Sequence, residues 1–227
     1  MKCRLAVEDV EAGHWVAYVL DMPGCFSSGE SEEEAIAGIP ARVEAYFNWV
    51  SGHGFPTFLP NDDVAYEVVE SFQSYESPTE PGYLVNAFFM NDHKPLGYWE
   101  VQTALRLMTW TREDLFELTK SLSQAQLSMT RTEGEAGTIA DILRHLAISE
   151  NWYLDRLGLA LPREDISGDV FGMLSDIRER ARKGLVELIG DKRVVTLKGE
   201  RWSGRKIIRR LLWHERDHTC QISKLLS

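Results

Sequence analysis

The stretch that decides the fold is SGRKIIRRLLWHERDHTCQISKLL, residues 203–226. Its apolar residues recur three or four positions apart, the spacing that places side chains on one face of an α-helix. That face carries two histidines among aliphatic residues, and its members are Ile207, Leu211, His214, His218 and Ile222. Such a face must be buried against other helices, so the stretch predicts a helical bundle with two imidazoles in its core.

Three stretches upstream show the same helical period, over about 97–122, 138–157 and 170–189. Four helices of comparable length joined by modest loops are typical of a four-helix bundle. We therefore expect residues 97–227 to form an all-α four-helix bundle. The charged run 178–183 is interpreted as the solvated face of its third helix.

The first ninety residues follow a different pattern. Strand-forming residues dominate four segments, which are 2–11, 14–20, 64–72 and 83–89. Ser31 followed by three glutamates is typical of a helix N-terminus and predicts a helix over 32–51, which Pro40 should bend. Residues 1–92 are expected to form an α+β domain with a small antiparallel sheet and one main helix.

The charge distribution argues against a nucleic-acid partner. Residues 1–95 hold 4 Lys and Arg against 16 Asp and Glu, whereas 96–227 hold 21 against 19. A polyanion would be repelled by the first half, so no nucleic-acid partner is expected.

The sequence contains no run of eighteen apolar residues, so no membrane span is predicted. The three cysteines form no CxxC pair and fit a reducing cytoplasm, and Cys220 is expected to be a small buried residue.

The histidines suggest a metal site. His214 and His218 are four residues apart, which places their rings about 40° apart around the helix and about 6 Å apart along it. His145 occupies the inward stripe of the helix over 138–157 and could supply a third ligand. Three histidines leave coordination positions open for chemistry, whereas structural zinc normally has four protein ligands. Buried histidines bonded to backbone carbonyls would give the same spacing, and the residues alone leave both readings open.

Neighbouring polar residues could assist such a site. Asp141, one turn before His145, and Ser149, one turn after it, are candidates to orient an imidazole or to contact a substrate. Arg210 could contact an anionic substrate, although a surface position is the preferred interpretation. Glu215 is expected to face solvent. The sequence assigns no catalytic residue.

The last helix, with Trp213-His214-Glu215-Arg216-Asp217-His218, resembles the closing segment of the DinB-like superfamily of metal-binding four-helix bundles. The segment Ile142-Leu143-Arg144-His145-Leu146-Ala147 is similar to it as well. The resemblance covers about 97–227. It implies a divalent ion, often zinc or nickel, on His145, His214 and His218. Members with known activities use small cellular thiols in transfer and isomerisation reactions, so a low-molecular-weight thiol is a further expected cofactor.

The N-terminal half resembles the HicB-like fold through Asp21-Met22-Pro23-Gly24-Cys25 and the segment 29–35. This resemblance covers about 2–70. It implies an antitoxin-like domain that binds a partner protein, although a helical bundle stands where such proteins usually carry a DNA-binding domain.

Two functions follow as expectations. The first is a metal-dependent enzyme in which an activated thiol or water attacks a small electrophilic substrate. The alternative is a binding or regulatory protein whose HicB-like domain docks a partner while the metal is structural or vestigial. Homodimerisation is expected for either, because the tryptophans exceed what one small bundle needs to bury; they include Trp99, Trp110, Trp152 and Trp213.

Overall fold

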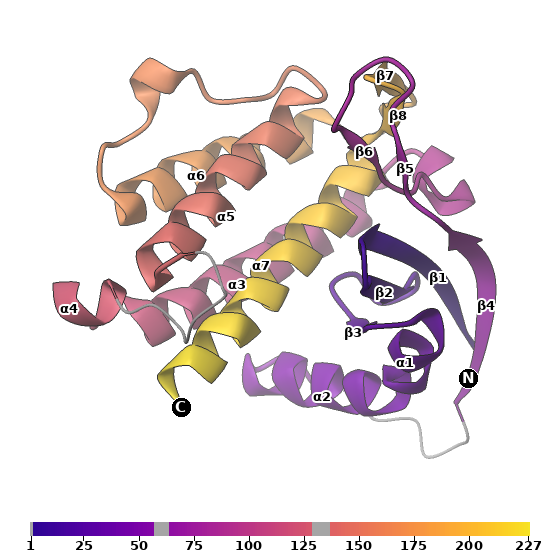
Figure 1. Cartoon of the computed structure of the whole chain (residues 1–227), viewed down its shortest axis with the longest axis horizontal. Coiled ribbons are helices and arrows are strands. Elements are labelled where there is room, and N and C mark those ends of the chain that lie inside the picture. The colour runs from indigo at the N-terminus through magenta and orange to yellow at the C-terminus, as the bar shows by residue number, and fades with distance from the viewer. Residues whose placement is uncertain (1, 57–63, 129–136) are drawn as a thin grey trace. The chain divides into compact units, whose positions relative to one another are not determined.

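The computed structural model describes residues 2–56, 64–128 and 137–227, and the chain divides into two compact units. The first unit comprises Met1–Lys94 with Thr196–Trp202, and the second comprises Pro95–Val195 with Ser203–Ser227. The larger strands belong to the first unit and the long helices to the second (Figure 1). The chain therefore passes between the units three times, whereas the sequence predicted a single boundary between residues 92 and 97.

The first unit is built on a four-stranded sheet in the order β3-β2-β1-β4. Its strands are β1 Lys2–Glu11, β2 His14–Val19, β3 Phe26–Gly29 and β4 Ala65–Phe72. β1 and β2 form the predicted hairpin, and β2 pairs antiparallel with β3. β4 pairs parallel with β1, so the expectation of an antiparallel sheet is wrong at this strand. The reason is the helical connection between β3 and β4, which lets the chain cross over before it re-enters the sheet.

That connection consists of α1 Glu32–Ala37 and α2 Ile39–Gly52 rather than one bent helix. Ser31 caps α1 as predicted, because its side chain accepts a hydrogen bond from the backbone N–H of Glu34 at 3.2 Å. The break falls at Gly38, and Pro40 lies in the first turn of α2. Proline is tolerated there because the first helical N–H groups have no partner within the helix.

The predicted strand over 83–89 is present only as β6 Leu84–Val85, which pairs with β5 Tyr75–Glu76. After β6, side-chain carboxylates accept hydrogen bonds from the backbone N–H groups. The N–H of Ala87 donates to the buried carboxylate of Glu8 at 2.7 Å, and the N–H of Phe89 donates to Asp92 at 3.0 Å. Because these donors have partners outside a β-ladder, the segment does not need to be a strand.

A hairpin within the helical half was not expected. β7 Val195–Leu197 and β8 Glu200–Trp202 are joined by Lys198 and Gly199, whose φ angles of 54° and 83° fit a type I′ turn. The hydroxyl of Ser77 donates to the carbonyl of Lys198 at 2.6 Å, and Tyr83 donates to the carboxylate of Glu200. The half predicted to be all-α therefore gives one hairpin segment to the first unit.

The second unit contains four long helices at the predicted places, and each packs against two others. α3 and α5 both contact α6 and α7, which produces a bundle. The elements of this unit are α3 Tyr98–Thr119, α4 Gln124–Leu127, α5 Ile139–Asp155, η2 Arg163–Asp165, α6 Val170–Glu187 and α7 Gly204–Leu226. Within the described ranges, none of the helices is both long and apolar enough to cross a membrane.

Candidate metal centre

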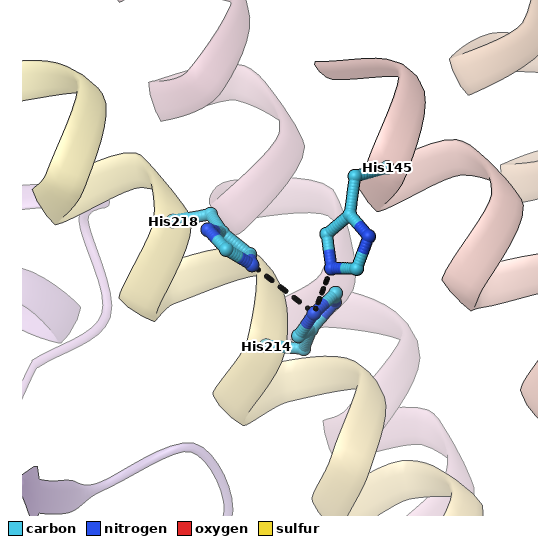
Figure 2. A group of neighbouring side chains, drawn as sticks. All are labelled: His145, His214 and His218. Carbon is cyan, nitrogen blue, oxygen red and sulfur yellow. Dashed lines mark hydrogen bonds between the residues drawn. The ribbon is translucent and has the colours of Figure 1, made fainter. Parts of the chain in front are cut away.

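His145 on α5 meets His214 and His218 on α7 with the ring nitrogens turned toward one another (Figure 2). The Nε2 atom of His214 lies 3.0 Å from Nε2 of His145 and 3.1 Å from Nε2 of His218. One ligand atom from each residue lies within 4.8 Å of the other two. Three nitrogens around a tetrahedral zinc ion would be about 3.3–3.4 Å apart, given Zn–N bonds of about 2.0–2.1 Å. The spacing is therefore close to that of a metal site.

Hydrogen bonds alone do not account for this arrangement. An imidazole nitrogen carries either one hydrogen or one lone pair, so Nε2 of His214 can make one ordinary hydrogen bond. It has two close nitrogen neighbours. A cation that accepts all three lone pairs satisfies every nitrogen at once. The donor set thus fits a divalent transition metal such as zinc or nickel, for which imidazole is a common ligand.

Burial favours the neutral form of His214, which is the form that binds a metal ion. The residue is only 8% exposed, and His218 is half-buried. His145, which was expected on the inward stripe of its helix, is instead exposed. Burial lowers the pKa of His214 well below its ordinary value, and the neighbouring His218, His145 and Arg210 lower it further. Metal binding requires the neutral imidazole, and the low pKa keeps His214 neutral at neutral pH. The exposed His145 marks the side from which the site can be reached.

Gln221 contacts one of the three histidines and was not predicted from the sequence. Its side-chain oxygen lies 2.7 Å from Nδ1 of His218 and accepts a hydrogen bond when that nitrogen carries the proton. This bond selects the tautomer in which Nε2 of His218 presents its lone pair to the other two rings. Metal-ligating histidines commonly donate their second N–H in this way. The signal in the sequence was an amide one helical turn after the second histidine.

We expect Gln221→Leu to raise the dissociation constant for zinc by roughly 10–100-fold, as is typical when an outer partner of a ligating histidine is lost. Competition with a chromophoric chelator measures this constant. Ser223→Ala, on the same turn of α7, is the control. An unchanged constant in Gln221→Leu would show that the bond does not orient the ligand.

Asp141 and Ser149 were the other candidates near His145, and neither is hydrogen-bonded to the histidines in the described part of the chain. The carboxylate of Asp141 accepts from the backbone N–H and the hydroxyl of Thr138, both at 2.8 Å, and forms the capping box of α5. These bonds hold the pKa of Asp141 below its usual value. Ser149 is half-buried on α5. In the part of the chain that the structure describes, no hydrogen bond joins either residue to the three histidines.

Asp141 should therefore matter for stability and not for the metal. We expect Asp141→Ala to lower the midpoint of thermal unfolding while the zinc dissociation constant stays unchanged. Thr138→Ala removes the other half of the capping box and should lower the free energy of unfolding by about 1 kcal/mol. A weaker zinc affinity in Asp141→Ala, measured by chelator competition, would instead assign this carboxylate to the metal site.

The surface positions expected for Arg210 and Glu215 are both wrong. Arg210 is 7% exposed, and its guanidinium carbon lies 4.6 Å from the ring centre of Trp213 and 5.8 Å from that of Tyr153. The ring of Tyr153 is in turn 5.9 Å from that of His214. Arg210 thus places a positive charge near the histidines.

The expectation that Cys220 is buried is also wrong, because this residue is exposed.

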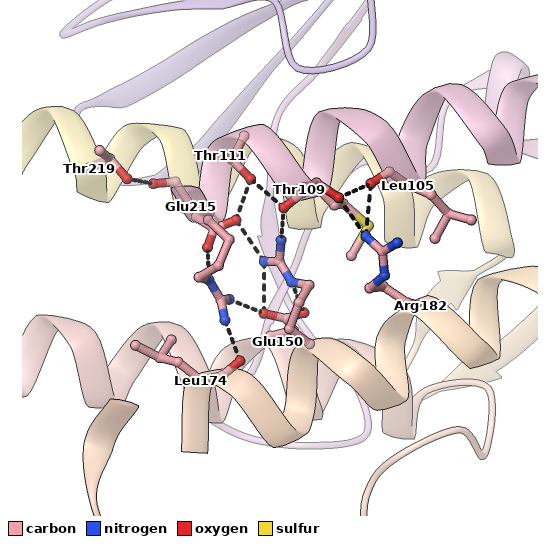
Figure 3. Close-up of polar contacts among 11 residues, drawn as sticks. Leu105, Thr109, Thr111, Glu150, Leu174, Arg182, Glu215 and Thr219 are labelled. Carbon is pink, nitrogen blue, oxygen red and sulfur yellow. Dashed lines mark hydrogen bonds and ion pairs between the residues drawn. The ribbon is translucent and has the colours of Figure 1, made fainter. Parts of the chain in front are cut away.

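Glu215 belongs to a buried group of four charged residues, one from each long helix, which we call the charge cluster. Figure 3 labels its two acidic members, Glu150 and Glu215. Its members are Arg112 of α3, Glu150 of α5, Arg178 of α6 and Glu215 of α7, and they are 2–7% exposed. Arg178 was expected on a solvated face. Burial opposes ionisation of Glu215, but the guanidinium groups of Arg112 and Arg178 outweigh it and hold the pKa of Glu215 far below its usual range.

Each guanidinium of the charge cluster bridges both carboxylates. Arg178 donates to Glu150 at 2.7 Å and 2.9 Å and to Glu215 at 2.6 Å. Arg112 donates to Glu150 at 2.8 Å and to Glu215 at 2.5 Å. The hydroxyl of Thr111 adds a bond to Glu215 at 2.5 Å. Remaining guanidinium donors reach the backbone carbonyls of Met108 and Leu174, so the cluster is extensively hydrogen-bonded.

Together these features define a helical unit with a three-histidine site open to solvent, in a chain that also contains a strand-rich unit. No protein-family model matches the chain. It is 32% identical over 53 residues to the UPF0150 protein Ta0767 of Thermoplasma acidophilum, a match that covers 23% of this chain and 77% of the relative. Over that stretch the chain belongs to the UPF0150 family.

Among solved structures, the chain is similar to YfiT from Bacillus subtilis, described as a probable metal-dependent hydrolase with an unusual four-helix bundle topology. The sequences are 18% identical, and the similarity covers 60% of this chain and 93% of YfiT with a TM-score of 0.44. This score does not establish a common fold. The case for a metal therefore rests on the three histidines themselves.

Proposed function

We propose that the helical unit is a metal-dependent enzyme of the DinB-like type, with one divalent ion held by His145, His214 and His218. The observation that carries the proposal is the pair of short contacts on Nε2 of His214, which a single imidazole nitrogen cannot satisfy with one proton. Zinc and nickel are the favoured ions. Bound there, such an ion supplies Lewis-acid chemistry that lowers the pKa of water or a small thiol.

The protein's own residues would prepare this chemistry. The three imidazoles supply three neutral ligands and leave further positions for a nucleophile and a substrate. His145 is exposed, so small molecules can approach from its side. Arg210 contributes a positive charge near His214 and supports an electrophilic substrate that carries an anionic group. The reaction class is attack of a thiol or water on a small electrophile.

Turnover by metal-loaded protein tests this function. Protein reconstituted with zinc or nickel is assayed on activated esters for hydrolysis, and on small electrophiles with added low-molecular-weight thiols for transfer. The proposal expects turnover that disappears with a chelator and in His145→Ala. Turnover that persists in a metal-free His145→Ala protein would contradict it.

We also propose a second function, in which the N-terminal unit is a HicB-like binding module and the metal is structural. The similarity to the UPF0150 protein Ta0767 supports the HicB-like assignment of the N-terminal unit. Trp99 on α3 of the second unit is 77% exposed and supports self-association through the bundle. Copurification of a stoichiometric partner, together with a metal that stabilises the fold without turnover, would favour this function over catalysis.

A further inference from the structure

Stability alone does not explain why the bundle contains the charge cluster. Transferring four charged side chains from water to a protein interior carries a large desolvation penalty, and apolar residues of similar volume are often as stabilising or more so. Such clusters can instead specify one arrangement of helices. The charge cluster has the composition for this role, since its two guanidinium groups and two carboxylates balance in charge.

The carboxylates of the cluster lie on the two helices that carry the metal ligands. Glu215 directly follows His214 on α7, and Glu150 lies five residues after His145 on α5, about 7.5 Å further along that helix. Both Arg112 and Arg178 bridge Glu150 to Glu215. The cluster therefore links α5 to α7 close to the point where His145 must meet His214.

This link restricts the geometry that a metal site depends on. Metal–ligand distances are met to within about 0.2 Å, so a small axial slide of α5 against α7 would move His145 out of reach. Arginine donates from a rigid planar fork and accepts little change in the position of its carboxylate partner. Two guanidinium groups that share the same two carboxylates thus resist such a slide.

A small cavity brings the charge cluster next to a ligand. Its volume is about 10 Å³, and its lining includes His214, Tyr153 and all four cluster residues. The cluster is thus close enough to influence His214 directly, in addition to its effect on the two helices.

We propose that the charge cluster of Arg112, Glu150, Arg178 and Glu215 is the positioning element of the three-histidine centre, fixing α5 against α7 so that His145 meets His214 and His218. The inference rests on the proposed metal site and concerns residues that do not bind the ion. Arg178 is the most informative member, because it lies on α6, which contributes no ligand, and makes three of the five guanidinium–carboxylate hydrogen bonds of the cluster.

The test compares Arg178→Lys with wild-type protein, using Co²⁺ as the probe. Lysine keeps the charge but loses the planar fork that bridges Glu150 and Glu215. The matched control is Arg182→Lys, one turn further along α6, because Arg182 bonds to Thr109 and Leu105 of α3 and is not part of the cluster. The Co²⁺ dissociation constant, the visible spectrum of the bound ion and the urea unfolding of the metal-free protein are measured for all three.

The proposal expects Arg178→Lys to unfold cooperatively, to bind Co²⁺ roughly 10–100-fold more weakly and to show an altered spectrum, while Arg182→Lys matches wild type. A quadruple variant with Arg112→Met, Glu150→Leu, Arg178→Met and Glu215→Leu should also fold and bind Co²⁺ weakly. Wild-type affinity and spectrum in either folded variant would overturn the positioning role and leave the metal site intact. Absence of Co²⁺ binding by wild-type protein would overturn the metal site and the inference together.

Discussion

We expect zinc to stabilise the wild-type protein by about 2.7 kcal/mol when free zinc is one hundred times its dissociation constant, and we expect no such stabilisation in His145→Ala. The reason is that an ion that binds only the folded state shifts the unfolding equilibrium by mass action. His145 is the best ligand to remove because it is exposed, so its loss leaves no cavity in the core. Urea unfolding at fixed free zinc measures the effect.

His14→Ala is the control for this first prediction. His14 lies on β2, outside the candidate metal site, and its ring lies 3.4 Å from the carboxylate of Glu11. This variant should keep the full stabilisation by zinc. Equal stabilisation of wild type and His145→Ala would mean that zinc binds elsewhere on the chain.

The second large effect concerns the stability of the bundle. Arg178→Met removes one cation from the charge cluster and leaves two buried carboxylates with one guanidinium, so we expect the free energy of unfolding to fall by about 3–5 kcal/mol. Burial makes this loss much larger than that of an exposed ion pair such as Lys183 with Glu179. Urea unfolding of the metal-free protein measures it.

The same measurement on the quadruple apolar variant separates charge from packing. With both carboxylates and both guanidinium groups replaced, no buried charge remains without a partner. Its free energy of unfolding should therefore exceed that of Arg178→Met. A quadruple variant less stable than the single one would show that the cluster stabilises the bundle through its own interactions, and not merely by neutralising buried charges.

The helical half could be predicted from local periodicity, because each long helix carries its own apolar stripe. The stripe of α7 placed Ile207, His214 and Ile222 in the core, where the structure has them. The Ser31 cap was equally visible, since the cap and its partner Glu34 are three residues apart. Features of this kind depend on neighbours along the chain and need no knowledge of tertiary contacts.

The charge cluster was missed although it left a trace in the sequence. Arg178 lies between Leu174 and Leu185 on the buried stripe of α6, and Glu150 lies between Leu146 and Leu154 on that of α5. A charged residue at a core position needs a partner of opposite charge. The partners come from other helices, however, and a periodic pattern on one helix does not reveal which residues face it. Reading Arg178 with its charged neighbours in sequence produced the wrong assignment.

Long-range pairing explains the remaining errors. The parallel register of β4 with β1 and the assignment of β8 to the first unit both depend on contacts between distant segments. Only the turn of the β7–β8 hairpin had a local signal, which is the glycine of Lys198-Gly199. The predicted pairing of β1 with β2 was confirmed because those strands adjoin in sequence.

The central claim is that His145, His214 and His218 bind one metal ion, and the metal content of untagged protein tests it most directly. Inductively coupled plasma mass spectrometry on wild type, His145→Ala and His218→Ala, each reconstituted with zinc or nickel and then desalted, counts the ions per chain. The account predicts one ion per chain in wild type and none in either variant. No ion in wild type, or an undiminished count in the variants, would contradict it.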